Sequence, residues 1–143
     1  MRYIGLDLGS KTCGIALSDA LGMMAHAYKT VVFESDDYDT ALDLVEKEMA
    51  DNQVDVVVLG YPKHMNGDVG IRGQISEQFK EALEEETGKK VVLWDERLTT
   101  VASEKILIEG RVRRENRKKY IDQLAAVNIL QGYLDSLKVR NEQ

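Results

Sequence analysis

The sequence is poor in cysteine, proline and long apolar runs, and each shortage excludes a class of protein. Its 143 residues include one cysteine, Cys13, so no internal disulfide can form. No stretch approaches the roughly 18 consecutive apolar residues of a membrane-spanning helix, and residues 1–10 lack the apolar run of a signal peptide. The single proline, Pro62, lies in no Pro/Ser-rich linker, and no repeat divides the chain. We therefore expect a single domain over residues 1–143, in a reducing, cytoplasmic setting and without a membrane partner.

Positive charge is scarce except in one segment. The formal net charge of −6 argues by itself against a nucleic-acid partner. Residues 111–119 (RVRRENRKK), however, hold six basic side chains and one acidic one, which leaves thirteen basic and twenty-four acidic residues elsewhere. A phosphate backbone responds to such a local patch rather than to total charge. A charge run alone is more often a solvated loop, so its meaning depends on the motifs beside it.

The first third of the chain has the pattern of strands. Residues 2–8 alternate between an apolar face and a second face that carries Asp7. Turn-forming residues follow at 9–11 and 19–22, and they separate two further apolar segments at 13–18 and 25–33. A three-stranded antiparallel meander is therefore expected.

Beyond this meander, helical spacing alternates with strands. Ser35 is expected to cap a first helix, and further helices are expected at 70–87, from 99 or 100 to 110, and at 117–138. Apolar runs at 54–59 and 91–94 predict two strands, the first buried on both faces. With right-handed crossovers, the order βββαβαβαα predicts an α/β fold in which a mixed five-stranded sheet, with its first strand central, has helices on both faces. This is the RNase H-like architecture.

Acidic residues follow two of the expected parallel strands. If strands one, four and five are neighbours, their carboxyl ends bring together Asp7, residues 60–67 and the Asp95–Glu96 pair. Carboxylates that converge at an apolar sheet end repel one another and favour a bound cation. Hard oxygen ligands suit Mg²⁺ or Mn²⁺, which can support phosphodiester hydrolysis, and the lack of a Cys/His cluster argues against zinc. An Asp before a Gly turn is otherwise a common turn former, but the end of a central strand makes Asp7 the leading ligand.

Spacing determines the other two ligands less well. Neighbouring strand residues face opposite ways, so Asp95 or Glu96, but not both, can join Asp7. Asp122 lies in the first turns of the last helix, where an acid commonly interacts with the helix dipole. The small pair Ala125–Ala126 would let this helix lie close to the sheet and bring Asp122 to the same edge. The basic segment precedes this helix, so it would lie at the rim of the acidic site and attract phosphate.

Four ordered blocks of the sequence resemble the YqgF (RuvX) family over nearly the whole chain. They read GLDLGSKTCGIALSD, VVVLGYPKHMNGD, VVLWDERLTTVASEKIL and KKYIDQLAAVNILQGYLD. The resemblance implies an RNase H-like fold and a nuclease that matures the 5′ end of 16S ribosomal RNA or resolves Holliday junctions. It places the family's acidic residues on Asp7, Glu96 and Asp122, and by analogy alone it favours Glu96 over Asp95.

The second block departs from the family's usual GLP-x-N-x-x-G form. The differences fall at Tyr61, Lys63 and His64, within GYPKHMNG. They concern the loop's contribution to the choice of substrate, not the metal site.

We therefore expect an Mg²⁺- or Mn²⁺-dependent endonuclease in which Asp7, Glu96 and Asp122 are both catalytic residues and metal ligands. The family resemblance alone makes precursor ribosomal RNA the expected substrate, with branched DNA as the close alternative. A resolvase needs two active sites and hence a homodimer, whereas a processing nuclease can act as a monomer. Eight basic residues are expected to contact nucleic acid: Lys11, Lys63, Arg97, Arg113, Arg114, Arg117, Lys118 and Lys119.

Two other functions stay open at this point. The DLGS sequence that ends the first strand also resembles the phosphate-binding hairpin of actin-like ATPases, although 143 residues supply only one of the two lobes such enzymes need. A nucleic-acid-binding module without catalysis would use the same basic residues and leave the acids structural. It predicts salt-sensitive binding and no metal-dependent cleavage.

Overall fold

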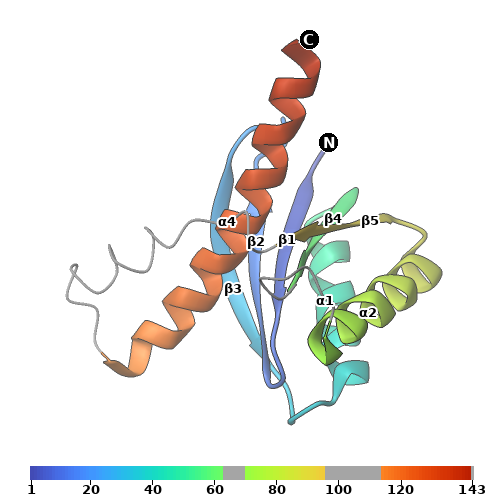
Figure 1. Ribbon diagram of the computed structural model, residues 1–143, viewed down its shortest axis with the longest axis vertical. Coiled ribbons are helices and arrows are strands. Elements are labelled where there is room, and N and C mark those ends of the chain that lie inside the picture. Colours follow the sequence, from blue (N-terminus) through green and yellow to red (C-terminus); the bar gives the residue numbers. More distant parts are fainter. Residues whose placement is uncertain (63–69, 96–113, 143) are drawn as a thin grey trace.

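The computed structural model describes residues 1–62, 70–95 and 114–142, and within the last segment the side chains of residues 123–138. A five-stranded sheet in the order β3-β2-β1-β4-β5 forms its centre (Figure 1). The antiparallel meander consists of β1 (Tyr3–Leu8), β2 (Thr12–Ser18) and β3 (Ala25–Val32). Both β4 (Val56–Tyr61) and β5 (Lys90–Asp95) run parallel to β1. The expected mixed sheet with β1 at its centre is confirmed.

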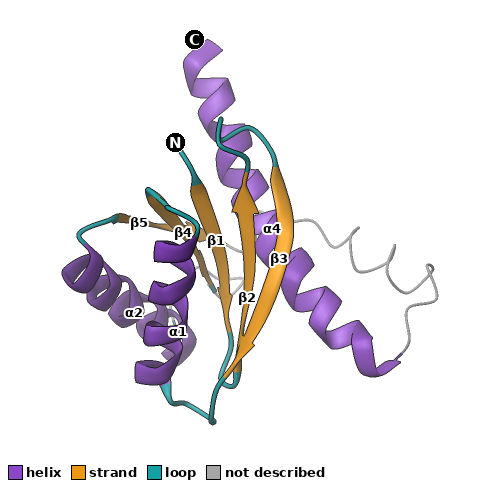
Figure 2. Cartoon of the chain, turned by 180° about the vertical axis from the view of Figure 1, so that it is seen from behind, coloured by secondary structure: helices purple, strands orange, loops and turns teal. Residues whose placement is uncertain are grey.

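Helices cover both faces of this sheet, as expected (Figure 2). One face carries α1 (Tyr38–Asp51) and α2 (Ile71–Thr87), and α4 (Arg114–Glu142) crosses the other. The helix expected at 99–110 lies outside the described residues. Among the described helices, none has the length and apolar character needed to span a bilayer.

The expected cap of the first helix was wrong. Asp37, not Ser35, is the N-cap residue, and its carboxylate accepts a hydrogen bond from the Thr40 backbone N–H at 3.2 Å. The preceding Asp36 has a φ of +61°, so the chain is still turning at this point and the helix begins later than the sequence pattern indicates. The expected end of the second helix at residue 87 is confirmed, and Gly88, which follows it, has a left-handed φ of +70°.

Strand alternation divides the apolar residues into two cores. Ile4 and Leu6 of β1 are fully buried with side chains of α1 and α2, whereas Ala16 and Val58 are fully buried with side chains of α4. The β4 run contributes to both cores, since its neighbour Val57 belongs to the first. This strand is therefore buried on both faces, as its nearly continuous apolar run predicts.

The helix α4 lies very close to β1 because Gly5 has no side chain. A methyl group placed at Gly5 would lie 2.7 Å from Leu130 Cβ and 2.8 Å from the carbonyl oxygen of Ala126. Ala126 is itself fully buried. Small residues thus allow the close packing of the last helix that the Ala125–Ala126 pair indicates.

Candidate active site

Asp7 lies half-buried near the carboxyl end of β1, on the face that α4 covers. Gly5 and Tyr3, two and four positions before Asp7, establish this face, since successive side chains of a strand alternate. Gly5 contacts Ala126 of α4, and the Tyr3 ring lies 6.1 Å from the ring of Tyr133. The expected placement of Asp7 at the end of the central strand is thus found.

Glycines flank Asp7 on both neighbouring strands. Gly14 of β2 is its antiparallel partner, and the parallel register that pairs Leu6 with Leu59 places Gly60 of β4 level with it on the other side. The two residues level with Asp7 on the neighbouring strands therefore carry no side chain. Such a position suits an acid that must share its oxygens with a cation and a phosphate group.

The structure separates the two candidate acids that follow β5. Val92 and Trp94 pack with the α4 core, whereas Val91 and Leu93 pack with the core under α1 and α2. Asp95 is half-buried and has the same parity as Val91 and Leu93, so it lies on the face opposite Asp7. Glu96 lies outside the described residues.

Asp122 belongs to α4, and its side chain lies outside the described part of the structure. Its helix position is one turn before Ala126, whose carbonyl oxygen lies over Gly5. Of the three expected acids, the structure thus describes Asp7 in full and Asp122 by its backbone. It places α4, which carries Asp122, against β1, which carries Asp7.

The expected nucleic-acid contacts are described to different extents. Lys11 is exposed in the turn after β1, where its carbonyl accepts a hydrogen bond from the Phe33 N–H at 2.9 Å. Four basic residues lie in the first turns of α4, with only their backbone described: Arg114, Arg117, Lys118 and Lys119. Lys63, Arg97 and Arg113 lie outside the described residues.

Sequence reasoning missed Arg72, which reaches the same edge of the sheet from the first turn of α2. Its Nη2 atom donates a hydrogen bond to the carbonyl of Leu8, the residue after Asp7, at 2.7 Å. The two residues are 64 positions apart, so no local pattern could indicate the contact.

A second acidic group lies on the other face of the sheet. Carboxylate oxygens of Asp43 and Glu46 on α1 and of Glu86 on α2 lie within 4.8 Å of one another. Burial raises the pKa of Glu46 to about 7, and a hydrogen bond and repulsion from Glu86 add to this effect. This group shares no face with Asp7, so it is separate from the predicted catalytic site.

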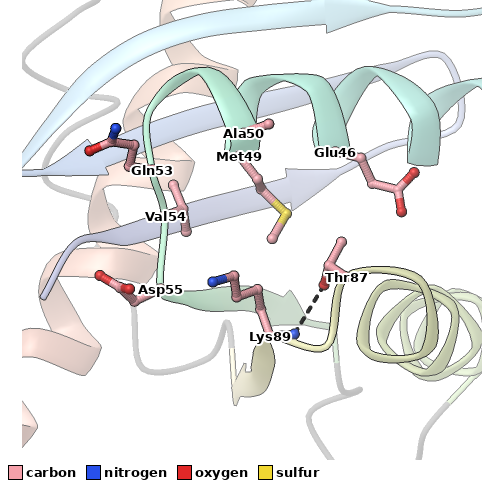
Figure 3. A pocket seen from close by; sticks show the side chains of 8 residues that line it. All are labelled: Glu46, Met49, Ala50, Gln53, Val54, Asp55, Thr87 and Lys89. Carbon is pink, nitrogen blue, oxygen red and sulfur yellow. Dashed lines mark hydrogen bonds between the residues drawn. The ribbon is translucent and has the colours of Figure 1, made fainter.

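A hollow of about 430 Å³ lies beside Glu46 at the amino ends of the parallel strands (Figure 3). Val54 and Asp55, which precede β4, and Lys89, which precedes β5, line it. Met49 gives it an apolar floor. Because Asp7 lies at the opposite, carboxyl end of these strands, this hollow is not the site of the predicted chemistry.

Comparisons with known proteins show the family and the fold. The sequence model of the family described as "RuvX: Holliday junction resolvase" matches residues 1–136. A Bacillus licheniformis protein named "Putative pre-16S rRNA nuclease" is 53% identical over 137 residues, covering 96% of this chain and 99% of that protein. A Bacillus subtilis protein of the same name is 52% identical, with the same coverage. Thermus thermophilus RuvC in complex with a Holliday junction substrate shares the fold, with a TM-score of 0.60, 13% identity and 96% of each chain covered. The chain belongs to the RuvX family.

Proposed function

We propose that this protein is a metal-dependent nuclease in which Asp7, Glu96 and Asp122 hold Mg²⁺ or Mn²⁺. The observation that carries the proposal is the position of Asp7 at the carboxyl end of the central strand, between two glycines and under α4. A nuclease is also what the names of the relatives say of those proteins.

The packing of α4 supports Asp122 as a ligand. Tyr133 lies beside Tyr3 and Ala126 beside Gly5, so the helix runs opposite to β1. Two residues along a strand span roughly 6.6 Å, and one helical turn spans about 5.4 Å. Continuing from Gly5 to Asp7 therefore corresponds to one turn back along α4, from Ala126 to position 122.

Strand alternation supports Glu96 rather than Asp95. Val92 and Trp94 belong to the α4 face, and the next residue of that parity is Glu96. The residue types fit Mg²⁺ or Mn²⁺, because all three proposed ligands are carboxylates. Cys13, a soft ligand on the neighbouring strand β2, is fully buried in the core under α1 and α2.

The proposed chemistry is hydrolysis of a phosphodiester bond. Mg²⁺ or Mn²⁺ held by Asp7, Glu96 and Asp122 would supply an activated water and stabilise the leaving oxygen. Asp7 would orient this centre from the sheet, and the exposed Lys11 and the basic start of α4 would attract the phosphate backbone. The role assigned to the three acids is to bind the cation, whose positive charge offsets the repulsion between their carboxylates.

We propose the 5′ end of precursor 16S ribosomal RNA as the substrate, because relatives with about half of their residues identical carry that name. A four-way DNA junction is the second candidate, since the family is described as a Holliday junction resolvase. The processing nuclease can act as a monomer, whereas the resolvase requires a homodimer.

A cleavage assay with Mg²⁺ or Mn²⁺ tests the proposal. The labelled substrates are a 5′-extended 16S precursor fragment and a four-way junction, and the variants are Asp7→Asn and Asp43→Asn. Asp7→Asn should lower the cleavage rate by at least about 100-fold, while Asp43→Asn, in the acidic group on the other face, should cleave like wild type.

Each outcome has a distinct meaning. Cutting of the RNA alone identifies the processing nuclease, and symmetric cutting of the junction identifies the resolvase. Loss of activity in Asp43→Asn but not in Asp7→Asn would move the metal site to the other face. Salt-sensitive binding without cleavage of either substrate would instead identify a binding module.

A further inference from the structure

The backbone groups of β1 alternate between its two neighbouring strands. The Val56 N–H donates to the Arg2 carbonyl at 3.3 Å, toward β4, and the Gly9 N–H donates to the Thr12 carbonyl at 2.7 Å, toward β2. Even-numbered residues of β1 therefore direct their backbone N–H and C=O groups to β4. The carbonyl of Leu8, at the end of the strand, is directed to that side.

The only proline of the chain deprives this carbonyl of its expected partner. The register pairs Leu6 with Leu59, so a continued parallel ladder would bring the N–H of residue 62 to the Leu8 carbonyl. Residue 62 is Pro62, which has no N–H. The strand that carries Asp7 thus ends on a carbonyl that β4 cannot satisfy.

Arg72 supplies the missing donor. Its guanidinium comes from α2 and donates to the Leu8 carbonyl at 2.7 Å in a partly buried hydrogen bond. Its charge also acts on the Tyr38 hydroxyl at the start of α1: burial raises the pKa of Tyr38, the hydrogen bond to Asp36 adds to the rise, and Arg72 opposes it. Arg72 therefore joins the end of β1 to the starts of both helices on the opposite face.

We infer that Arg72 is a positioning residue, which fixes the end of β1 so that Asp7 presents its carboxylate correctly to the metal. The inference rests on the proposed function. Asp7 immediately precedes Leu8, so a shift of the Leu8 carbonyl moves the backbone that bears the carboxylate. A displacement of about 1 Å at a catalytic group can lower a rate by about 100-fold. Arg72 acts through Leu8 and not on the substrate.

The test compares Arg72→Met with Arg2→Met. Arg2 is a matched control, because its Nη1 atom donates to the Asn52 carbonyl at 3.1 Å beside the amino end of the same strand. Both variants lose one positive charge and one guanidinium–carbonyl hydrogen bond. Arg72→Met should lower kcat by about 10- to 100-fold with KM unchanged, and Arg2→Met should leave both unchanged.

Mn²⁺ binding gives a readout apart from catalysis. Isothermal titration calorimetry measures the Mn²⁺ affinity of both variants, with Asp7→Asn defining the binding that depends on Asp7. Arg72→Met should weaken that component several-fold, and Arg2→Met should not. Should Arg72→Met fail to fold, Arg72→Lys, which keeps the charge and a donor, should show the same changes to a smaller extent.

Two results would overturn the inference. A higher KM with unchanged kcat and a salt dependence reduced by about one phosphate contact would make Arg72 a phosphate ligand. Equal kcat and Mn²⁺ affinity in the two Met variants would leave Arg72 without a role at the site. If the wild-type protein cleaves neither substrate, the proposed function fails, but the Mn²⁺ affinities still decide whether Arg72 positions Asp7.

Discussion

Replacing Gly5 with alanine should damage the active site more than the fold. The added methyl carbon would lie 2.7 Å from Leu130 Cβ and 2.8 Å from the Ala126 carbonyl oxygen. Non-bonded carbon atoms pack at about 3.5–4.0 Å, so α4 must move away from the sheet by roughly 1 Å. A rotamer change cannot relieve these contacts, because one involves a backbone atom and the other a Cβ atom.

This displacement predicts two magnitudes. Overpacking of this kind costs about 1–3 kcal/mol of unfolding free energy. The same movement carries helix position 122 away from Asp7, and a misplacement of about 1 Å can reduce a catalytic rate by up to about 100-fold. Urea denaturation measures the first quantity and the RNA cleavage assay the second.

Gly88→Ala is the matched control for lost stability. Nothing lies within 4 Å of a methyl group at Gly88, but its φ of +70° is unfavourable for alanine, at a cost of about 1 kcal/mol. This variant should therefore lose stability and keep its cleavage rate. A Gly5→Ala protein with wild-type activity, or a parallel loss of activity in Gly88→Ala, would refute the link between α4 packing and catalysis.

Two further predictions concern the face covered by α1 and α2. Burial and Glu86 raise the pKa of Glu46 to about 7, so the protonated Glu46 stabilises the folded state at low pH. This stabilisation, on the order of 1–2 kcal/mol after solvent screening, is lost as the pH rises from about 4.5 to 7. Thermal melts of Glu46→Gln should lack this loss. Equal pH profiles for the variant and the wild type would contradict this account. Tyr61→Phe removes the hydrogen bond from the Tyr61 hydroxyl to Glu77, so it should cost at most about 1 kcal/mol in urea denaturation and leave RNA cleavage unchanged; a large loss of cleavage would place Tyr61 at the active site.

The fold could be predicted because its signals are local. Alternation in residues 2–8, the apolar run before Gly60 and the stop at Gly88 each depend on neighbours in the sequence. The cap at Asp37 was missed because the local signal is ambiguous. Ser35 and Asp37 are both good capping residues, and only the turn at Asp36 selects between them.

For the candidate site, the sequence could predict the position of Asp7 in the fold, and its role as a metal ligand stays a prediction. The position of Asp7 followed from the end of a central strand, whereas spacing could not choose between Asp95 and Glu96. That choice depends on which face each residue joins; the packing of Val91 and Val92 in different cores gives the faces along β5, and Glu96 lies outside the described residues. Arg72 could not be found from the sequence, because its proposed role depends on the register between β1 and β4, which brings Pro62 to the Leu8 carbonyl.

The two faces of the sheet should tolerate change differently near Asp7, because the strand residues there differ in size. The face under α1 and α2 is filled by Ile4, Leu6 and Leu59, so substitutions there should alter stability and leave the chemistry in place. On the α4 face, a Cβ added at Gly5 would collide with the helix, and Gly14 is the strand partner of Asp7. Tyr61 illustrates the consequence. It departs from the family's usual residue, yet it shares the parity of Leu59 and bonds to Glu77 of α2, so the face opposite the proposed metal site accommodates the difference.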